Sequence, residues 1–156
     1  TAGLLALVDQ PDDWAALRRD PNLVPGAIEE TLRWASSTIY NRRTATAEIE
    51  LHGRTIRAGD KVVLWWQAAN FDPRAFDTPE RFDIRRSPNP HLAFGAGSHL
   101  CLGANLARLE IRLVLDGLLA RVERIELDGP AERTRSNKHA GFRHAPVTLH
   151  PVPSAG

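Results

Sequence analysis

The sequence contains no methionine and only one cysteine, Cys101, among its 156 residues. A single cysteine excludes an internal disulfide framework and a zinc site built from several cysteines, and it points to a reducing compartment. The 20 Lys and Arg residues nearly balance the 19 Asp and Glu residues, which leaves a net charge of +1. The whole-chain charge therefore gives no electrostatic case for binding nucleic acid or an acidic membrane surface.

Long apolar segments are also missing. The opening apolar run, residues 4–8, is shorter than the ~7–15 residues of a signal-peptide core, and it lacks a basic flank. No stretch approaches the ~18 apolar residues of a membrane-spanning helix, so we expect no membrane anchor. With 42% hydrophobic and 25% charged residues, the chain has the balance of a soluble globular domain, and we expect it to be cytoplasmic.

The first third of the chain predicts helices. Residues 11–19 carry acidic side chains in the first turn and arginines in the last, the order that the helix dipole favours. Pro25 suits the first position of a second helix that extends to about Trp34. Its apolar stripe faces away from Glu30 and Arg33.

Strands are expected over residues 38–64, where β-branched residues increase and helical periodicity ends. A hairpin is predicted around residues 52–54, and the apolar run 62–66 predicts a strand. Four prolines between Asn70 and Leu92 leave little room for regular structure. The pattern predicts a fold that is mainly α with small β-sheets (α+β).

A long helix is predicted from about Leu102 to Val122, with apolar residues on two opposite sides. One stripe consists of Leu102, Leu106, Leu109 and Leu113, and the other of Ala107, Ile111, Leu115 and Leu118. A helix that is apolar on two sides lies between two layers, which requires more protein than a small domain supplies. We therefore expect a part of a longer protein, although removal of an initiator methionine before Thr1 would also explain the missing methionine.

The segment most informative about chemistry is residues 94–103, Phe-Gly-Ala-Gly-Ser-His-Leu-Cys-Leu-Gly. It places Cys101 at the start of the long helix, where unpaired amides and the helix dipole favour a thiolate. Its three glycines remove side-chain bulk and permit positive φ, so the backbone can approach a large flat ligand.

Several roles compete for Cys101. It could be a small buried hydrophobic residue or a nucleophile with His99 as its base, although side chains two residues apart need not converge. A zinc site fails because no further Cys or His residues cluster nearby. The remaining role is an axial iron ligand, with the glycines making room for a porphyrin.

The same segment resembles the haem-binding loop of the cytochrome P-450 monooxygenases, with its Phe, its Gly, a basic residue two positions before the Cys and a Gly two positions after it. Long signatures of this kind are specific. Residues 102–110 also look like the helix that follows this loop in soluble bacterial members. The resemblance implies that residues 1–156 form the C-terminal, haem-binding part of that fold, without the upstream helix that delivers protons to bound oxygen.

The resemblance implies that Cys101 is the proximal thiolate ligand of the iron in haem b (iron protoporphyrin IX) and that Phe94 packs near the sulfur. The other residues that would bind the cofactor are Gly97, His99, Gly103 and Arg43. His99 and Arg43 would each meet a haem propionate through charge-assisted hydrogen bonds. The plain alternatives are an ordinary packed aromatic for Phe94 and solvated side chains for the other two.

Two further segments resemble a structural network of this family. Residues 30–33 match its Glu-x-x-Arg helix motif, and residues 79–82 match the segment whose arginine completes a Glu-Arg-Arg network. The alternative is a solvated i, i+3 ion pair worth ~0.2–0.5 kcal/mol. We predict the network of Glu30, Arg33 and Arg81, in which loss of one charge would leave another buried and unpaired.

The implied activity is insertion of one oxygen atom from dioxygen into a small apolar substrate, lipid-like or sterol-like, that residues 36–40 and 139–142 help to line. Electrons would come from NAD(P)H through a ferredoxin-type or flavoprotein donor that binds near Arg108 and Arg112, for which a solvated helix face is the alternative. Other possibilities are a haem-thiolate peroxygenase or isomerase, and a non-catalytic fragment or interaction module in which Cys101 is structural.

Overall fold

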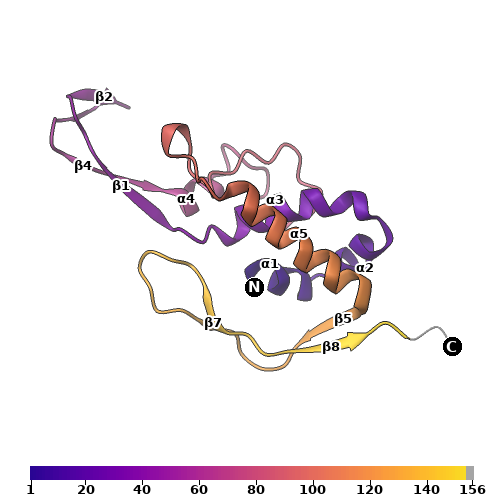
Figure 1. Cartoon of the computed structure of the whole chain (residues 1–156). Helices are drawn as coiled ribbons and strands as arrows, with labels where there is room; N and C mark the ends of the chain where they lie inside the picture. Colours follow the sequence, from indigo (N-terminus) through magenta and orange to yellow (C-terminus); the bar gives the residue numbers. More distant parts are fainter. Residues whose placement is uncertain (154–156) are drawn as a thin grey trace.

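The helices of the chain pack into one layered body. The computed structural model describes residues 1–153. Helices α1 (Ala2–Val8), α2 (Pro11–Arg19) and α3 (Val24–Ala35) follow one another, and α5 (Ala104–Arg121) contacts α2 and α3 (Figure 1). The predicted helix over 11–19 has these bounds, and α3 extends one residue beyond the prediction at each end.

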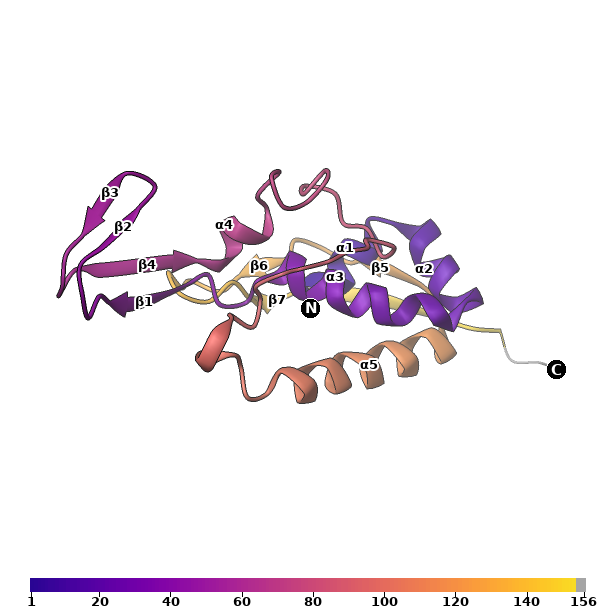
Figure 2. The same cartoon turned by 90° about the horizontal axis from the view of Figure 1, so that it is seen from above.

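Eight strands in residues 1–153 form four two-stranded antiparallel sheets. The pairs are β1 (Tyr40–Thr44) with β4 (Lys61–Trp65), β2 (Ile49–Leu51) with β3 (Arg54–Ile56), β5 (Val122–Leu127) with β8 (Val147–Pro151), and β6 (Glu132–Arg133) with β7 (Phe142–His144). The first two pairs form an arm that projects from the helical body, as Figure 2 shows at its left. The α+β prediction is thus confirmed.

The hairpin predicted around residues 52–54 joins β2 to β3. His52 and Gly53 both have positive φ, 50° and 72°, which suits a two-residue turn between twisted antiparallel strands. The predicted strand over 62–66 lies at 61–65, and a short helix, α4 (Trp66–Asn70), follows it directly. Sequence periodicity predicted neither α1 nor α4, because seven and five residues are too few for a repeat of 3.6 to stand out.

The core lies between α1, α2, α3 and α5. Its nearly inaccessible side chains include Leu7, Trp14, Leu17, Val24, Ile28, Phe82, Ile84 and Leu115. Phe82 and Ile84 come from the proline-rich segment, residues 71–92, which contains no helix or strand. This segment touches α3 closely at Gly26, where a Cβ atom would lie 2.5 Å from the Ile84 carbonyl oxygen. Only glycine permits that approach.

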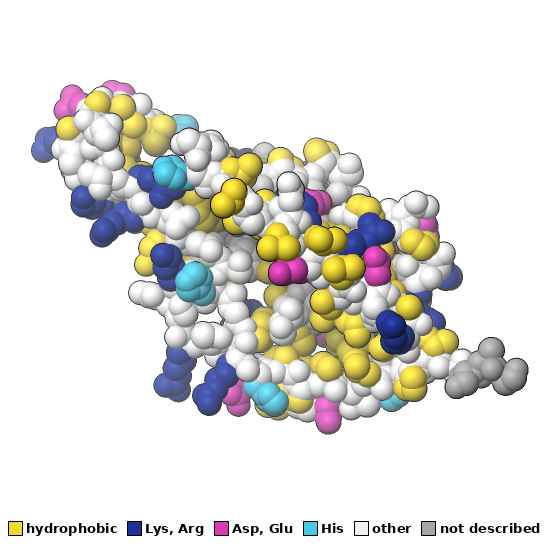
Figure 3. All heavy atoms as spheres, in the orientation of Figure 1, with side chains coloured by type: hydrophobic (Ala, Val, Ile, Leu, Met, Phe, Trp, Pro, Cys, Tyr) yellow, Lys and Arg dark blue, Asp and Glu magenta, His cyan; other side chains and the backbone are white. Residues whose placement is uncertain are grey.

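Helix α5 is covered on one of its two apolar sides. Leu115 is buried, and Ile111 and Leu118 pack against the core. In the described part of the chain, nothing covers the opposite stripe of Leu102, Leu106, Leu109 and Leu113, each of which is more than half exposed. Figure 3 shows hydrophobic side chains gathered over this helix. The expected covering of both sides therefore holds for one side only within residues 1–153.

No helix in residues 1–153 is both long and apolar enough to cross a membrane.

Candidate functional site: a buried charge network and an exposed cysteine loop

A completely buried ion pair lies on α3. Glu30 and Arg33 are one helical turn apart, and both side chains are inaccessible to solvent. Arg33 donates from Nε and Nη2 to the two carboxylate oxygens of Glu30, each at 2.8 Å. Its Nη1 also donates to the carbonyls of Asn70 and Pro79, at 2.8 and 3.0 Å. The ion pair is thus bidentate. Arg33 also connects α3 to the end of α4 at Asn70 and to the proline-rich segment at Pro79.

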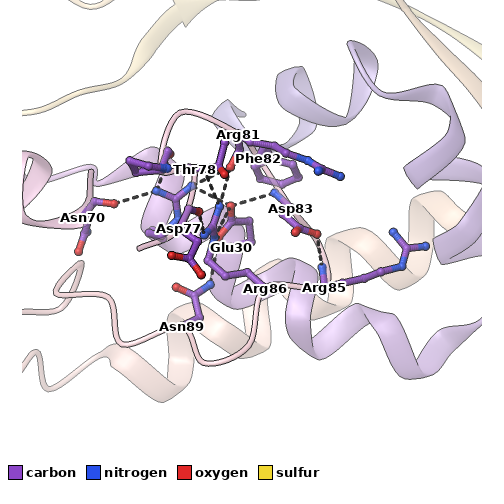
Figure 4. A network of polar contacts seen from close by, with 12 residues as sticks. Glu30, Asn70, Asp77, Thr78, Arg81, Phe82, Asp83, Arg85, Arg86 and Asn89 are labelled. Atoms are coloured by element: carbon purple, nitrogen blue, oxygen red, sulfur yellow. Dashed lines mark hydrogen bonds and ion pairs between the residues drawn. The ribbon is translucent and has the colours of Figure 1, made fainter. Parts of the chain in front are cut away.

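The third member of the network is Arg86, and the prediction of the Arg81 side chain is wrong. Arg86 Nε lies 3.2 and 3.1 Å from the two oxygens of Glu30. The side chain of Arg81 is exposed, and this residue contributes its carbonyl oxygen, which accepts hydrogen bonds from Arg33 at 3.2 Å and from Arg86 at 2.9 Å (Figure 4).

The path of the backbone explains why Arg86, and not Arg81, reaches Glu30 with its side chain. Phe82 buries its ring in the core, and the adjacent Arg81 presents its side chain to solvent and its carbonyl to the network. The chain then passes Glu30, where the Asp83 amide donates to Oε1 at 2.9 Å, before Arg86 reaches back. Arginines at 85 and 86 were a visible signal in the sequence, but no periodicity in an irregular segment indicates which one points inward.

Five donors surround the Glu30 carboxylate, since Asn89 Nδ2 also donates to Oε2 at 3.0 Å. Burial by itself raises the pKa of this carboxyl. The hydrogen bonds from Arg33 and the Asp83 amide, together with the charges of Arg33 and Arg86, outweigh burial, so its pKa lies below the usual value. Glu30 is therefore ionised and paired near neutral pH.

Asn70, the last residue of α4, extends the network toward the cysteine. Its side chain is fully buried; Oδ1 accepts from the Leu92 amide at 2.7 Å, and Nδ2 donates to Ser36 Oγ at 2.8 Å. Ser36 Oγ in turn donates to the Arg33 carbonyl at 2.7 Å. The sequence does not reveal this role, because an asparagine at the edge of an irregular segment is a common turn residue.

The cysteine loop, residues 93–103, follows immediately. The Cys101 amide donates to the Phe94 carbonyl at 3.0 Å and closes the loop. Gly95 and Gly97 have φ values of 72° and 70°, which favour glycine. The Cys101 carbonyl accepts from the amide of Ala104, the first residue of α5, at 3.2 Å. The loop thus presents Cys101 just before a helix start, as the sequence predicts.

The thiol of Cys101 is free and exposed. Exposure contradicts the role of a small buried residue. In residues 1–153, no hydrogen bond joins this thiol to His99, which lies exposed in the 3-10 turn Gly97–His99. Gly103 lies beside the sulfur: a Cβ atom added at this glycine would be 3.9 Å from Cys101 Sγ. Within residues 1–153, the structure thus offers an accessible sulfur without a preformed catalytic base.

The surroundings of Cys101 fit a flat apolar group that brings its own metal ligands. Leu100 and Leu102 are exposed on either side of the thiol, and a Cβ atom at Gly97 would meet nothing within 4 Å. The described residues contain no group of three or more His, Cys, Asp or Glu side chains that could hold a metal ion. One sulfur ligand suits an iron porphyrin, whose ring supplies the other equatorial ligands.

Other predicted cofactor residues lie in separate places. Phe94 is half-buried in the loop, with the Arg108 guanidinium 5.0 Å from its ring centroid. Arg43 is on β1, and within residues 1–153 its guanidinium hydrogen-bonds only the Arg42 carbonyl, at 3.1 Å. The side chains of His99 and Arg43 thus remain free of protein ion pairs in the described structure.

The two arginines expected to form an electron-donor face are both paired. Arg108 Nε and Nη2 donate to Glu29 at 2.7 and 2.9 Å, whereas Arg112 Nε donates to Asp116 at 2.9 Å on the same helix. The hydrogen bond between Arg108 and Glu29 lowers the pKa of the Glu29 carboxyl and raises that of the guanidinium. Both arginines remain partly exposed.

The two segments predicted to line a substrate site lie side by side. The Ala140 amide donates to the Ser37 carbonyl at 2.8 Å, and the Ile39 amide donates to the Lys138 carbonyl at 2.9 Å. Thr38 and His139 form an isolated antiparallel bridge between these bonds. Backbone hydrogen bonds thus join two segments that are more than 90 positions apart in the sequence.

Comparisons with known proteins agree on one family. The family model for cytochrome P-450 matches residues 10–148. The chain is 53% identical over 147 residues to cytochrome P-450 126 of Mycobacterium tuberculosis, covering 94% of this chain and 36% of that protein. It is 42% identical over 159 residues to a steroid C26-monooxygenase of the same organism, covering 100% of this chain and 40% of that protein.

The structure is similar to the crystal structure of CYP108D1 from Novosphingobium aromaticivorans, with a TM-score of 0.92 and 46% sequence identity. The match covers 97% of this chain and 37% of that one. This likeness confirms the fold predicted from the cysteine segment. The chain spans about two fifths of the length of the curated relatives it matches.

Proposed function

Because the chain belongs to the cytochrome P-450 family, we propose that it forms the haem-binding part of a monooxygenase, with Cys101 as the thiolate ligand of haem b. The observation that carries the proposal is the exposed sulfur of Cys101 in an apolar, glycine-containing loop at the start of α5. When bound, haem supplies dioxygen activation, and a thiolate ligand favours cleavage of the O–O bond.

The residues of this chain have distinct tasks in the proposal. The Cys101 amide, bonded to the Phe94 carbonyl, holds the sulfur in place, and Gly97 and Gly103 let the backbone lie close to the ring. Leu100 and Leu102, exposed beside the thiol, exclude water from the sulfur once a flat group covers them. His99 and Arg43 donate charge-assisted hydrogen bonds to the two propionates.

The proposed substrate is a small apolar molecule of the lipid or sterol class. Support comes from the steroid C26-monooxygenase among the relatives and from segments 36–40 and 139–142, which backbone hydrogen bonds hold side by side. The reaction inserts one oxygen atom from dioxygen and leaves the other as water, using two electrons and two protons. The single free cysteine suits the reducing cytoplasm as the place of reaction.

Electrons would come from NAD(P)H through a ferredoxin-type or flavoprotein donor. The partly exposed Arg108 and Arg112 lie on α5, directly beyond the cysteine loop. Opposite charges across such a face accelerate encounter, and salt screens them. We therefore expect electron transfer to slow steeply with ionic strength and to slow further in Arg112→Glu. Transfer that is indifferent to both changes would remove this face from the proposal.

The cysteine assignment is tested by adding haem to the full chain, reducing it and adding carbon monoxide. A thiolate-type Soret shift is expected in the unchanged chain and in the matched loop variant Ser98→Ala. Cys101→Ser should abolish the shift, because it removes the sulfur. A chain without the shift, or a Cys101→Ser variant that retains it, would contradict the proposal. Turnover without an electron donor would instead indicate a peroxygenase or isomerase.

A further inference from the structure

The carboxylate of Glu29 connects three parts of the molecule. Its Oε1 accepts from Arg108 Nε at 2.7 Å, and its Oε2 accepts from Arg108 Nη2 at 2.9 Å and from His91 Nε2 at 3.1 Å. Glu29 belongs to α3, Arg108 to α5, and His91 to the chain just before the cysteine loop. The neighbouring Glu30 has entirely different partners, so the two carboxylates serve separate networks.

Both ring nitrogens of His91 are used. Nδ1 accepts from the Ala93 amide at 3.3 Å, which assigns the ring proton to Nε2, the atom that faces Glu29. The side chain is only 4% exposed. Burial lowers the pKa of His91, and Arg108 lowers it further, while Glu29 and Glu30 act in the opposite direction without restoring the usual value. The ring is therefore neutral near neutral pH and donates one hydrogen bond.

Phe94 lies against two of these groups. The His91 ring meets the Phe94 ring edge-on, with centroids 6.1 Å apart and an angle of 60° between the planes. The Arg108 guanidinium lies 5.0 Å from the same Phe94 centroid, a distance suited to a cation–π contact. One carboxylate thus holds both neighbours of this ring, and the Phe94 carbonyl binds the Cys101 amide.

We propose that His91 is a positioning residue for the cysteine loop, which acts through Glu29 and Arg108 to hold Phe94 and thereby the backbone of Cys101. The arrangement orders the loop against α3 and α5 before any cofactor binds. Only the statement that the held sulfur ligates haem iron rests on the proposed function. The contacts among Glu29, His91, Arg108 and Phe94 involve protein atoms only. The order of the loop can therefore be tested separately from haem ligation.

Amide hydrogen exchange in the full chain without haem tests loop order directly. In His91→Leu, exchange at the Cys101 amide should accelerate about tenfold, the effect of one lost hydrogen bond, while interior α5 amides keep their rates. His91→Gln keeps a donor for Glu29 and should restore most of the protection. The control is His150→Gln, which removes an exposed histidine whose Nε2 lies 2.8 Å from Glu126, and it should change neither rate.

Unchanged Cys101 exchange in His91→Leu would overturn the proposal. If His91→Leu instead accelerates amide exchange throughout α5, the same measurement on Glu29→Gln tests the proposal. This substitution keeps the side-chain shape and removes the charge that joins His91 to Arg108. Selective acceleration at Cys101 supports the proposal, and an unchanged rate there overturns it.

The haem-loaded chain gives a second, independent result. His91→Leu should shift the reduction midpoint relative to the unchanged chain, and His91→Gln should shift it less. Identical midpoints in all three would overturn the link from His91 to the ligand. Absence of a thiolate spectrum in every chain, with selective exchange at Cys101 intact, would contradict the proposed function and leave the positioning role of His91 standing.

Discussion

The network around Glu30 and the loop around Cys101 differ in how their polar groups are paired. Glu30 and Arg33 are inaccessible to solvent, and five donors surround the carboxylate. Cys101 is exposed, its thiol is free, and its apolar neighbours Leu100 and Leu102 face solvent. One region pairs its buried charges within the described chain, and the other leaves its sulfur without such a partner there.

This difference teaches which part of the molecule maintains the fold and which part is available to a ligand. Charged groups tolerate burial only when hydrogen bonds replace water, so each buried charge of the network must be paired. A ligand site has the opposite requirement, because its groups must be accessible and incompletely paired before the ligand arrives. Asn70 joins the two regions, since it contacts Ser36 on one side and the Leu92 amide on the other.

The largest expected effect comes from breaking the closed region. Glu30→Gln leaves Arg33 and Arg86 buried without a counter-charge, and it should lower the free energy of unfolding by about 3–5 kcal/mol. The matched control is Glu110→Gln on the exposed surface of α5, which should change it by less than about 0.5 kcal/mol. Chemical denaturation measures both. Similar losses in the two variants would show that the network is not a special source of stability.

The two sides of α5 provide the next comparison. Leu115 is 3% exposed and Leu113 is 62% exposed, although they are two residues apart on one helix. Leu115→Ala should cost about 2–5 kcal/mol, because it leaves a cavity in the core. Leu113→Ala should have almost no effect on the same denaturation midpoint. A large loss in Leu113→Ala would mean that this stripe is covered in solution.

Arg86 and Arg81 separate a side-chain role from a backbone role. Arg86→Leu removes the hydrogen bonds to Glu30 and should cost about 1.5–3 kcal/mol. Arg81→Leu keeps the carbonyl that accepts from Arg33 and Arg86, so we expect a change within about 0.5 kcal/mol. Thermal or denaturant unfolding distinguishes them. The reverse order would restore Arg81 as the third member of the network.

The smallest expected effect is a dependence of stability on pH through His91. Its pKa in the folded chain lies below the usual value near 6.5, so the unfolded chain binds more protons in the interval between the two values. Stability is therefore complete above about pH 6.5 and decreases as pH falls through that interval. Glu29 and Glu30, whose pKa values lie below the usual 4.5, add a further loss under more acidic conditions.

Unfolding curves between pH 8 and pH 4, compared with those of His91→Gln, isolate the histidine contribution. The variant should lack the decrease that begins near pH 6.5 and retain the more acidic one. Identical pH profiles for the two chains would contradict the proposed contribution of His91 to the pH dependence of stability.

Local features of the fold were predictable where hydrophobic periodicity or turn residues in the sequence indicate them. The helix over 11–19, the hairpin at 52–54 and the long helix after Cys101 have the expected positions, because each depends on periodicity, capping or positive φ. The irregular segment has no such repeat. Whether Arg81 or Arg86 reaches Glu30 depends on how the backbone passes the core at Phe82 and Ile84, which packing determines.

The same limit applies to the cysteine loop. The sequence by itself determined that Cys101 stands in a glycine-containing loop before a long helix, because residue order and glycine positions suffice to establish both. Only the tertiary structure decided which distant groups converge there. Glu29, His91 and Arg108 come from three parts of the chain, and packing of α3 against α5 brings them to one ring, since hydrogen bonds require ångström distances that sequence spacing does not encode.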